Sequence, residues 1–242
     1  DAKWTKIFGE VIPAAQAHVA GVLHLPDPST ICFAGNTHEL FMRLMSSIER
    51  KPIRVLTTDS EFHSFNRQMQ RMTEAGQVEV ERIAAEPFAT FAERFSAAAA
   101  RGGHDLVYFS QCFYNSGWLV HELGPIVHAV RDPETLIVID GYHGYMALHT
   151  DLSAIAGRAF YLSGGYKYAM SGEGNAFMHC PPGQALRPVD TGWFAGFAEL
   201  STGPVQVGYA EGGLRFLGAT YDATALYRLN AVMDWPHTQN LT

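Results

Sequence analysis

The sequence has few cysteines, no cluster of positive charge and no long apolar run. Its three cysteines, Cys32, Cys112 and Cys180, are odd in number and lack CxxC spacing, so they form neither a disulfide framework nor a thiolate zinc site. The net charge is −7 and at most two Lys or Arg are adjacent, which excludes a basic surface for nucleic acid or an anionic membrane. No stretch reaches the roughly 20 apolar residues of a membrane span, and the first residues, Asp1-Ala2-Lys3-Trp4, do not have the pattern of a signal peptide. We expect a cytoplasmic protein without nucleic acid or membrane as a partner.

Several catalytic signatures are also absent. The chain has no GxSxG nucleophile elbow, no HExxH zinc motif and no GxxxxGK[ST] phosphate loop. Gly172-Glu173-Gly174 precedes an expected strand and not a helix, so it is not a dinucleotide fingerprint. The eleven histidines are scattered, and Asp140 and His143 have no third ligand at helical spacing. We therefore expect no metal site.

Short apolar runs alternate with longer amphipathic stretches along the chain. With 47% hydrophobic and 17% charged residues, 242 residues suffice to bury the core of one large domain. The runs expected to be strands are Thr30–Ala34, Ile53–Thr57, Val78–Ile83, Asp105–Ser110, Leu136–Asp140, Ala159–Ser163 and Ala176–Cys180. Most are continuously apolar, as in parallel strands covered on both faces. The expected fold is an α/β, three-layer α/β/α sandwich with a mostly parallel seven-stranded sheet.

Helical patterns lie between these runs. They cover about Glu39–Glu49, Ser64–Ala75, Phe88–Ala100, Leu123–Val130 and Leu152–Ile155. The chain also begins inside an apolar helical pattern. In sheets of this kind, ligands bind beyond the carboxyl ends of the strands, so the residues after each run are expected to carry the chemistry.

One lysine and one aspartate stand at such strand ends. Lys167 follows an apolar run in a Gly- and Tyr-rich loop, where partial burial would lower its pKa, as a Schiff-base lysine requires. The alternative is an exposed loop lysine. Asp140 closes another run, and a buried carboxylate there needs a cation such as a protonated pyridine nitrogen. The alternative is a helix N-cap. Taken alone, the two residues leave these alternatives open.

Two further strand ends carry groups suited to a flat, phosphorylated ligand. Asn36 and Thr37 lie between a strand and an amphipathic helix, where backbone N–H groups and the helix dipole favour a phosphate. Both residue types are also ordinary caps. Phe62 and His63 follow the second strand, where a ring either stacks on a heterocycle or packs in the core.

Together, several motifs resemble one family. They are Tyr166-Lys167-Tyr168, Gly172-Glu173-Gly174-Asn175-Ala176-Phe177, Arg187-Pro188 with Gly192-Trp193-Phe194, and Asp140-x-x-His143-Gly144. From about Thr30 to Asn230, the chain resembles the large domain of fold type I pyridoxal-phosphate enzymes. Within them it is similar to the class V aminotransferase group, and most closely to kynureninases. The resemblance implies pyridoxal 5'-phosphate as the cofactor and an amino acid as the small-molecule substrate.

The resemblance also implies roles for the strand-end residues. Lys167 would hold the cofactor as a Schiff base and remove the substrate's α-proton, Asp140 would pair with the pyridine nitrogen, and His143 would lie beside the ring. Phe62 would stack on the ring, with His63 as the second choice. The other implied cofactor contacts are Asn36, Thr37 and Tyr166 at the phosphate, then Ser163, and then Tyr114, which fits the kynureninase pattern.

Three residues further along complete the implied set. Trp193 matches a tryptophan of the kynureninase substrate pocket. Gly218 stands where kynureninases have an Asn that contacts the substrate's aromatic amine, so this chain lacks that hydrogen-bond partner and a more open pocket is expected. Thr220 would reach the phosphate in a partner subunit, which implies a homodimer.

Hydrolytic Cβ–Cγ cleavage of an amino acid, as in kynureninases, is the activity that the resemblance favours. A class V aminotransferase, a β-lyase and an inactive homologue that keeps the fold are the alternatives. The cysteine desulfurase branch is not expected, because none of the three cysteines lies after the large domain. Residues 1–234 would form the cofactor-binding large domain. Residues 235–242 would begin the link to a C-terminal small domain outside this chain.

Overall fold

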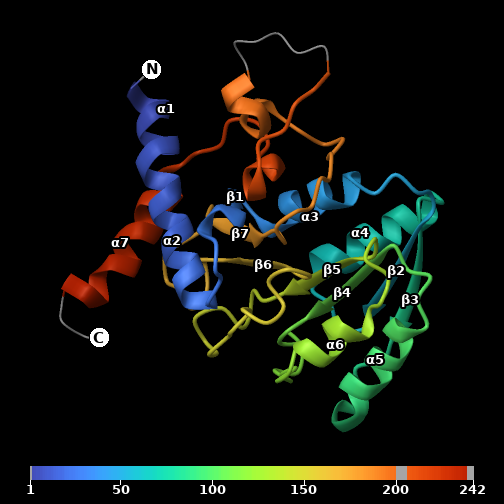
Figure 1. Ribbon diagram of the computed structural model, residues 1–242. Helices are drawn as coiled ribbons and strands as arrows, with labels where there is room; N and C mark the ends of the chain where they lie inside the picture. The colour runs from blue at the N-terminus through green and yellow to red at the C-terminus, as the bar shows by residue number, and fades with distance from the viewer. Residues whose placement is uncertain (1, 200–205, 239–242) are drawn as a thin grey trace.

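The computed structural model describes residues 2–199 and 206–238. These residues build a seven-stranded sheet with the strand order β1-β7-β6-β5-β4-β2-β3 (Figure 1). The strands are β1 (Ile31–Ala34), β2 (Ile53–Thr58), β3 (Val78–Ile83), β4 (Leu106–Ser110), β5 (Leu136–Asp140), β6 (Phe160–Gly164) and β7 (Ala176–His179). Every neighbouring pair from β6 to β3 is parallel, whereas β7 runs antiparallel to both β1 and β6. The predicted mostly parallel seven-stranded sheet is confirmed.

The strands lie where the continuous apolar runs predict them. β3 and β5 have the expected bounds, and the other strands differ by no more than one residue at each end. The reason is burial: every residue of β1, β4, β6 and β7 is buried, so these strands are mostly apolar and do not alternate with polar residues.

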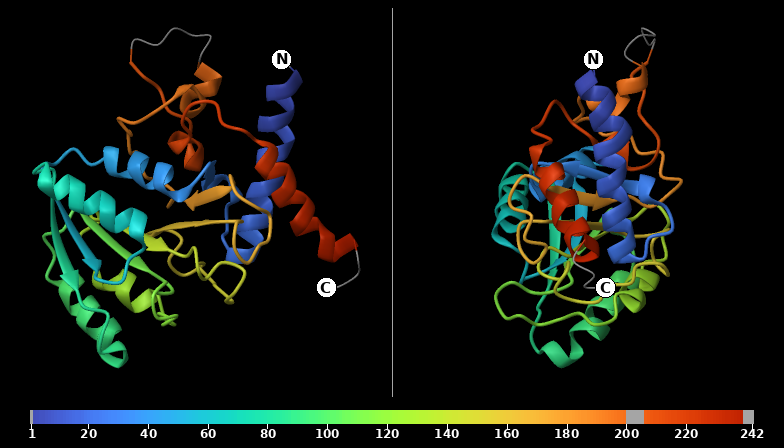
Figure 2. Two further views of the ribbon diagram at one scale, coloured as in Figure 1. Left: turned by 180° about the vertical axis from the view of Figure 1, so that it is seen from behind. Right: turned by 90° about the vertical axis from the view of Figure 1, so that its left-hand side faces the viewer.

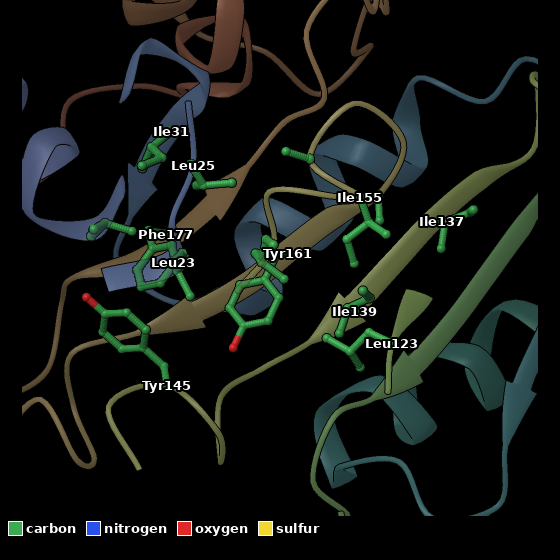
Figure 3. Packing of buried hydrophobic residues seen from close by; sticks show 14 of the residues in the cluster. Leu23, Leu25, Ile31, Leu123, Ile137, Ile139, Tyr145, Ile155, Tyr161 and Phe177 are labelled. Atoms are coloured by element: carbon green, nitrogen blue, oxygen red, sulfur yellow. The ribbon is translucent and has the colours of Figure 1, made fainter. Parts of the chain in front are cut away.

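Helices cover both faces of this sheet. α3 (Thr37–Ser46) and α4 (His63–Glu74) pack on one face. On the other face lie α2 (Ile12–Leu23), α5 (Phe91–Ala100), α6 (Gly124–Ala129) and α7 (Thr224–Thr238) (Figures 1 and 2). Figure 3 shows the core on this second face, where Leu23 of α2 and Leu123 meet Ile139, Tyr161 and Phe177 of the sheet. The predicted three layers are therefore present.

The remaining elements are short. They are α1 (Ala2–Lys6) and the π-helix η1 (Ile7–Val11), which lead into α2, and the 3-10 turns η2 (Pro28–Thr30), η3 (Phe88–Thr90), η4 (Trp193–Glu199) and η5 (Gly212–Phe216). The apolar helical pattern at the start of the chain is thus confirmed. None of the described helices is long and apolar enough to cross a membrane.

The predicted helix at Leu152–Ile155 is wrong. This segment forms hydrogen-bonded turns, in which the Ile155 N–H donates to the Leu152 carbonyl at 2.9 Å and the Ala159 N–H to the Ile155 carbonyl at 3.1 Å. So few residues do not offset the cost of helix nucleation. At the other end of the chain, the domain boundary expected at residue 235 falls inside α7, and residues 239–242 lie outside the described residues.

Candidate functional site

A cavity of about 300 Å³ opens at the carboxyl ends of the parallel strands. This is the lower end of the roughly 300–1,000 Å³ typical of small-molecule sites, and the position is the one where open α/β sheets bind ligands. The cavity is lined by Asn36, Thr37, His38, Phe41, Phe62, Ser64, Phe65, Tyr108, Asp140, Tyr142, His143, Tyr166 and Lys167. The structure thus brings together seven residues singled out in the sequence, namely Asn36, Thr37, Phe62, Asp140, His143, Tyr166 and Lys167.

The loop after β6 presents Lys167 and is organised by Asn175. The Asn175 Oδ1 accepts a hydrogen bond from the Gly165 N–H at 2.7 Å, and the Asn175 Nδ2 donates to the Ser171 Oγ at 2.9 Å. A Cβ at Gly165 would lie 1.9 Å from the Ser171 Oγ, so the loop requires glycine there. This loop holds Lys167 half-buried at the wall of the cavity.

Burial controls the charge of Lys167 and of the histidine that it touches. Desolvation lowers the pKa of Lys167, against the opposing effect of the Asp140 carboxylate. The Lys167 Nζ is in hydrogen-bond contact with the His143 Nε2. Desolvation and the lysine charge also lower the pKa of His143. Lys167 is therefore not a freely exposed loop lysine, and burial shifts its pKa in the direction that a nucleophilic amine requires.

The carboxylate of Asp140 is fixed by two donors. Its Oδ1 accepts the Tyr142 N–H at 2.9 Å, and its Oδ2 accepts the Tyr108 Oη–H at 2.8 Å. Burial raises the pKa of Asp140, while these two hydrogen bonds and the nearby Lys167 oppose the shift. No α-helix begins at the residues that follow, which form turns. Asp140 is thus a wall of the cavity and not a helix N-cap.

Phe62 lines the cavity, whereas His63 does not. The Phe62 ring centroid lies 5.7 Å from the Lys167 Nζ and 6.2 Å from the centroid of the His143 ring. Phe62 is 40% exposed, so ring area remains available to a flat ligand. His63 and Tyr114 pack against each other at 4.9 Å between ring centroids, and Tyr114 meets the Phe62 ring edge-on at 5.4 Å. Tyr114 therefore supports Phe62 from outside the lining.

Asn36 caps α3 in a reciprocal arrangement with Glu39. The Asn36 Oδ1 accepts the Glu39 N–H at 3.0 Å, and the Asn36 Nδ2 donates to the Glu39 Oε1 at 2.9 Å. Thr37 and His38 begin the helix and line the cavity. The first N–H groups of a helix have no intrahelical acceptor and attract anions. An anion at this turn would therefore meet backbone N–H groups and the Thr37 hydroxyl, because the Asn36 amide is occupied by the cap.

Three predicted residues form a separate group outside the cavity lining. The Trp193 Nε1–H donates to the Thr220 Oγ1 at 2.9 Å. The third residue, Gly218, is buried against the Arg43 guanidinium, because a Cβ at position 218 would lie 2.3 Å from the Arg43 Nη2. The space beside Gly218 is thus filled by Arg43, where the sequence predicts an opening.

Ser163 also lies outside the lining. It is buried in β6, and its Oγ–H donates to the Gly141 carbonyl at 3.3 Å. Its contact therefore ties β6 to the turn that begins directly after Asp140 and includes His143.

Sequence reasoning missed six residues of the lining, namely His38, Phe41, Ser64, Phe65, Tyr108 and Tyr142, and also the buried Glu61. The Tyr142 ring lies 5.2 Å from the Lys167 Nζ, and Tyr108 donates to Asp140 from inside β4. Glu61 is fully buried next to Phe62, and burial raises the pKa of Glu61 to about 7. Tyr142 and Glu61 each stand beside a predicted residue. Tyr108 lies on the same face of β4 as Ser110, the strand-end residue two positions later. The two-residue period of a strand is therefore the sequence signal that could have indicated Tyr108.

Three hydroxyl and amide groups satisfy the buried carboxylate of Glu61. It accepts the Thr58 Oγ1–H at 2.6 Å, the Ser110 N–H at 3.2 Å and the Ser110 Oγ–H at 2.5 Å. These bonds oppose the effect of burial on its pKa. They also tie the segment before Phe62 to the end of β4.

Comparisons with known proteins place this geometry in a family. The profile described as Aminotransferase class-V matches residues 3–242. No curated protein sequence matches the chain significantly.

Solved structures share the fold at low sequence identity. The complex of the cystine C–S lyase C-DES with its reaction product cysteine persulfide has a TM-score of 0.77 and 19% identity, over 99% of this chain and 64% of that chain. The cysteine desulfurase CsdA from Escherichia coli has a TM-score of 0.74 and 15% identity, over 98% and 59%. The ureidoglycine-glyoxylate aminotransferase from Bacillus subtilis has a TM-score of 0.70 and 12% identity, over 99% and 60%. The chain spans less than two thirds of the length of each of these structures.

The chemistry of the cavity and the sheet together define the class of protein. A half-buried amine suits an aldehyde, a carboxylate with both oxygens anchored suits a protonated pyridine nitrogen, and the first turn of α3 suits a phosphate. One ligand with all three groups and a flat ring fits the residues present, so this is a pyridoxal-phosphate-binding domain of fold type I. More particularly, the chain belongs to the class V aminotransferase family, and its cofactor is pyridoxal 5'-phosphate.

Proposed function

We propose that the protein is a pyridoxal-phosphate-dependent enzyme that acts on an amino acid, with the cofactor held as a Schiff base on Lys167. The observation that carries the proposal is Lys167, half-buried and with a lowered pKa, at the wall of the cavity that Asp140 also lines. When bound, the cofactor supplies the electron sink that amino-acid chemistry requires. Phe62 provides the stacking ring, and Thr37 and Tyr166 contribute at the phosphate.

Lys167 and His143 are suited to proton transfer near the substrate. A neutral Lys167 amine acts as the general base toward the α-proton of the amino acid. The His143 Nε2 touches the Lys167 Nζ, so the proton taken up at the lysine has an acceptor within contact distance. The donors on the two oxygens of Asp140 oppose the effect of burial on its pKa and so favour the ionised form opposite the pyridine nitrogen.

Hydrolytic Cβ–Cγ cleavage, as in kynureninases, is the first candidate reaction. It is supported by the motifs around Lys167 and Trp193 and by a histidine in contact with the lysine, which can hold a proton for an attacking water. The second candidate is a β-lyase, and the likeness to a cystine C–S lyase favours it. An aminotransferase stands as the third, since one of the similar structures is a ureidoglycine-glyoxylate aminotransferase.

A homodimer belongs to the same proposal. Thr220 lies outside the cavity lining and is exposed, which suits a hydroxyl that reaches the phosphate in a partner subunit. We also propose that residues 1–234 are the cofactor-binding large domain of a longer enzyme. This is supported by the similar structures, because the chain spans less than two thirds of the length of each. The free thiols of Cys32, Cys112 and Cys180 support a cytoplasmic location.

Cofactor binding tests the proposal first. The purified full-length protein, mixed with pyridoxal 5'-phosphate, should turn yellow and lose the colour on borohydride reduction, with the label on Lys167 by peptide mass spectrometry. The Tyr145→Phe variant, which alters a buried tyrosine outside the cavity, should behave in the same way. A protein that stays colourless with excess cofactor is an inactive homologue.

A panel of amino acids then distinguishes the reactions. Kynureninase-like hydrolysis yields alanine and an acid from a substrate with a γ-carbonyl, a β-lyase yields pyruvate, ammonia and the leaving group, and an aminotransferase yields a 2-oxo acid only with an amino acceptor. Product analysis by mass spectrometry identifies the reaction. Release of pyruvate and ammonia without an amino acceptor, and without alanine, would replace the first candidate with the second.

A further inference from the structure

We propose that Tyr108 is a positioning residue, which orients the Asp140 carboxylate toward the pyridine nitrogen of the cofactor through the hydrogen bond from its hydroxyl. This inference rests on the proposed function, because it assigns Asp140 to that nitrogen. The bond runs from the Tyr108 Oη to the Asp140 Oδ2 at 2.8 Å, and both residues line the cavity.

The parallel register of the sheet creates this contact. Tyr108 of β4 is paired with Val138 of β5, and Ser110 with Asp140. Side chains two positions apart on a strand share a face, so Tyr108 and Asp140 lie diagonally on the same face of the sheet. The length of the tyrosine side chain lets its hydroxyl reach across that diagonal.

Packing fixes the ring from which the hydroxyl projects. Tyr108 is 3% exposed. Its ring stacks on Phe65 at 3.9 Å between centroids and 14° between planes, and it meets Phe41 edge-on at 5.3 Å. Both neighbours come from helices, α4 and α3, that cover this face. The hydroxyl therefore has a defined position relative to β5 and little freedom to choose another partner.

Electrostatics keep Tyr108 a donor. Burial and the charges of Asp140 and Glu61 raise the pKa of the phenol well above its usual range, so the hydroxyl retains its proton. The Tyr142 N–H holds the other oxygen of Asp140 at 2.9 Å. With one donor on each oxygen, the plane of the carboxylate is fixed and its remaining lone pairs are left for a cation in the cavity.

The test compares removal of two buried hydroxyl groups. Tyr108→Phe removes the donor and keeps the stacking ring. Tyr145→Phe is the matched control, because Tyr145 is equally buried and its hydroxyl has no hydrogen-bond partner among the described residues. The readouts on the full-length protein are the dissociation constant of pyridoxal 5'-phosphate, the pH at which the visible band of the bound cofactor shifts, and the thermal unfolding of the apo-protein.

A double-mutant cycle shows whether Tyr108 acts through Asp140. Tyr108→Phe should raise the cofactor dissociation constant about tenfold, since hydrogen bonds to charged groups are stronger than those between neutral groups. It should also change the pH at which the visible band of the bound cofactor shifts. Tyr145→Phe should change neither. In the Asp140→Asn background, Tyr108→Phe should have no further effect on the dissociation constant, because the two residues form one unit.

Three results would overturn the assignment of Tyr108: cofactor binding within twofold of the wild type, equal effects of the two tyrosine variants, or losses that multiply in the double variant. Each of these is distinct from failure of the proposed function, in which the wild-type protein itself binds no pyridoxal 5'-phosphate. A fall in apo-protein stability with an unchanged band pH would assign Tyr108 to packing alone.

Discussion

The residues singled out in the sequence occupy two regions of the structure, of which one lines the cavity and the other does not. The first region is the cavity at the strand ends, where Lys167, Asp140 and Phe62 line one space together. The second region, Trp193 with Gly218 and Thr220, has no part in that lining. In this second region, the Trp193 indole N–H donates a hydrogen bond to the Thr220 hydroxyl, and Arg43 fills the space beside Gly218.

If the protein forms the proposed homodimer, this difference separates what one chain does from what the two chains do together. The first region offers amine, carboxylate, ring and helix N-terminus within a single fold, so it should bind the cofactor by itself. In the second region, Thr220 is exposed and does not line the cavity of its own chain. Substitutions in the first region should therefore act at every protein concentration, and those in the second only where subunits associate.

The largest effect should come from Lys167→Ala. Because the Schiff base needs this amine, borohydride reduction should leave no covalent cofactor on the variant, while its circular dichroism stays that of the wild type. Lys6→Ala, on the exposed side of α1, is the control and should be labelled as the wild type. Label on a different lysine in Lys167→Ala would move the chemistry away from the first region.

Asp140→Asn should have the next largest effect. Breaking a partly buried ion pair leaves a charge without its partner, so the dissociation constant of pyridoxal 5'-phosphate should rise about a hundredfold, as roughly 3 kcal/mol implies. Fluorescence titration measures it. Asp151→Asn, at a fully exposed carboxylate, should bind as the wild type does. Unchanged binding by Asp140→Asn would remove Asp140 from the pyridine nitrogen.

The buried acid beneath Phe62 should give the first region a pH dependence. Because the pKa of Glu61 is raised from 4.5 to about 7, the folded state binds a proton in this interval that the unfolded state has released. The stability that this proton contributes is complete below about pH 4.5 and lost as the pH rises through about 7.

The Glu61→Gln variant should lack this loss. Relative to the wild type, its free energy of unfolding should gain up to about 3 kcal/mol as the pH rises through that window, at about 1.36 kcal/mol per pKa unit. Urea unfolding at several pH values measures the difference. Glu74→Gln, on the exposed side of α4, should show no such trend. A difference between Glu61→Gln and the wild type that stays constant with pH would contradict the shift.

Phe62→Ala should weaken cofactor binding by a smaller factor. Loss of an aromatic stacking partner costs about 0.5–1.5 kcal/mol in addition to the loss of buried apolar area, which corresponds to a rise in the dissociation constant of about twofold to tenfold. His63→Ala is the matched control, because its ring packs on Tyr114 outside the lining. A larger loss for His63→Ala than for Phe62→Ala would reverse the assignment of the stacking ring.

The smallest effect should be that of Thr220→Ala. Its cofactor affinity should equal that of the wild type at protein concentrations where the chain is monomeric, and fall below it only where sedimentation shows a dimer. Titrations at two protein concentrations, each matched to a sedimentation run, make the comparison. An equal loss in the monomer would place Thr220 in the first region and end the distinction between the two.

Much of the fold was predictable because the pattern of apolar residues that marks each strand or helix lies within a short segment of the sequence. Continuous apolar runs located most of the strands, since strands covered on both faces cannot alternate polar and apolar residues, and the alternating run Val78–Ile83 located the edge strand β3. Leu152–Ile155 has the apolar residues of a helix and forms turns, because its length does not support nucleation. α7 escaped prediction, and its place against α2 is a tertiary contact between opposite ends of the chain (Figure 2).

The site was predictable in part for the same reason. Lys167 and Asp140 stand directly at strand ends, so their sequence positions alone directed attention to the sheet edge. Tyr108 lies inside a strand, and its role depends on the pairing of β4 with β5 and on the rings of Phe65 and Phe41. No pattern along the chain specifies which neighbour a strand takes.

The sequence by itself determined the strands, most of the helices between them and the strand ends that carry the amine, the carboxylate and the aromatic ring, because periodicity and strand position are properties of the chain. Only the tertiary structure decided between the alternative roles that the sequence leaves open for these residues. It turned Lys167 inward beside His143, placed Phe62 and not His63 on the cavity, and filled the space at Gly218 with Arg43. These outcomes depend on burial and on contacts between distant segments, and both arise only when the strands have taken their order in the sheet.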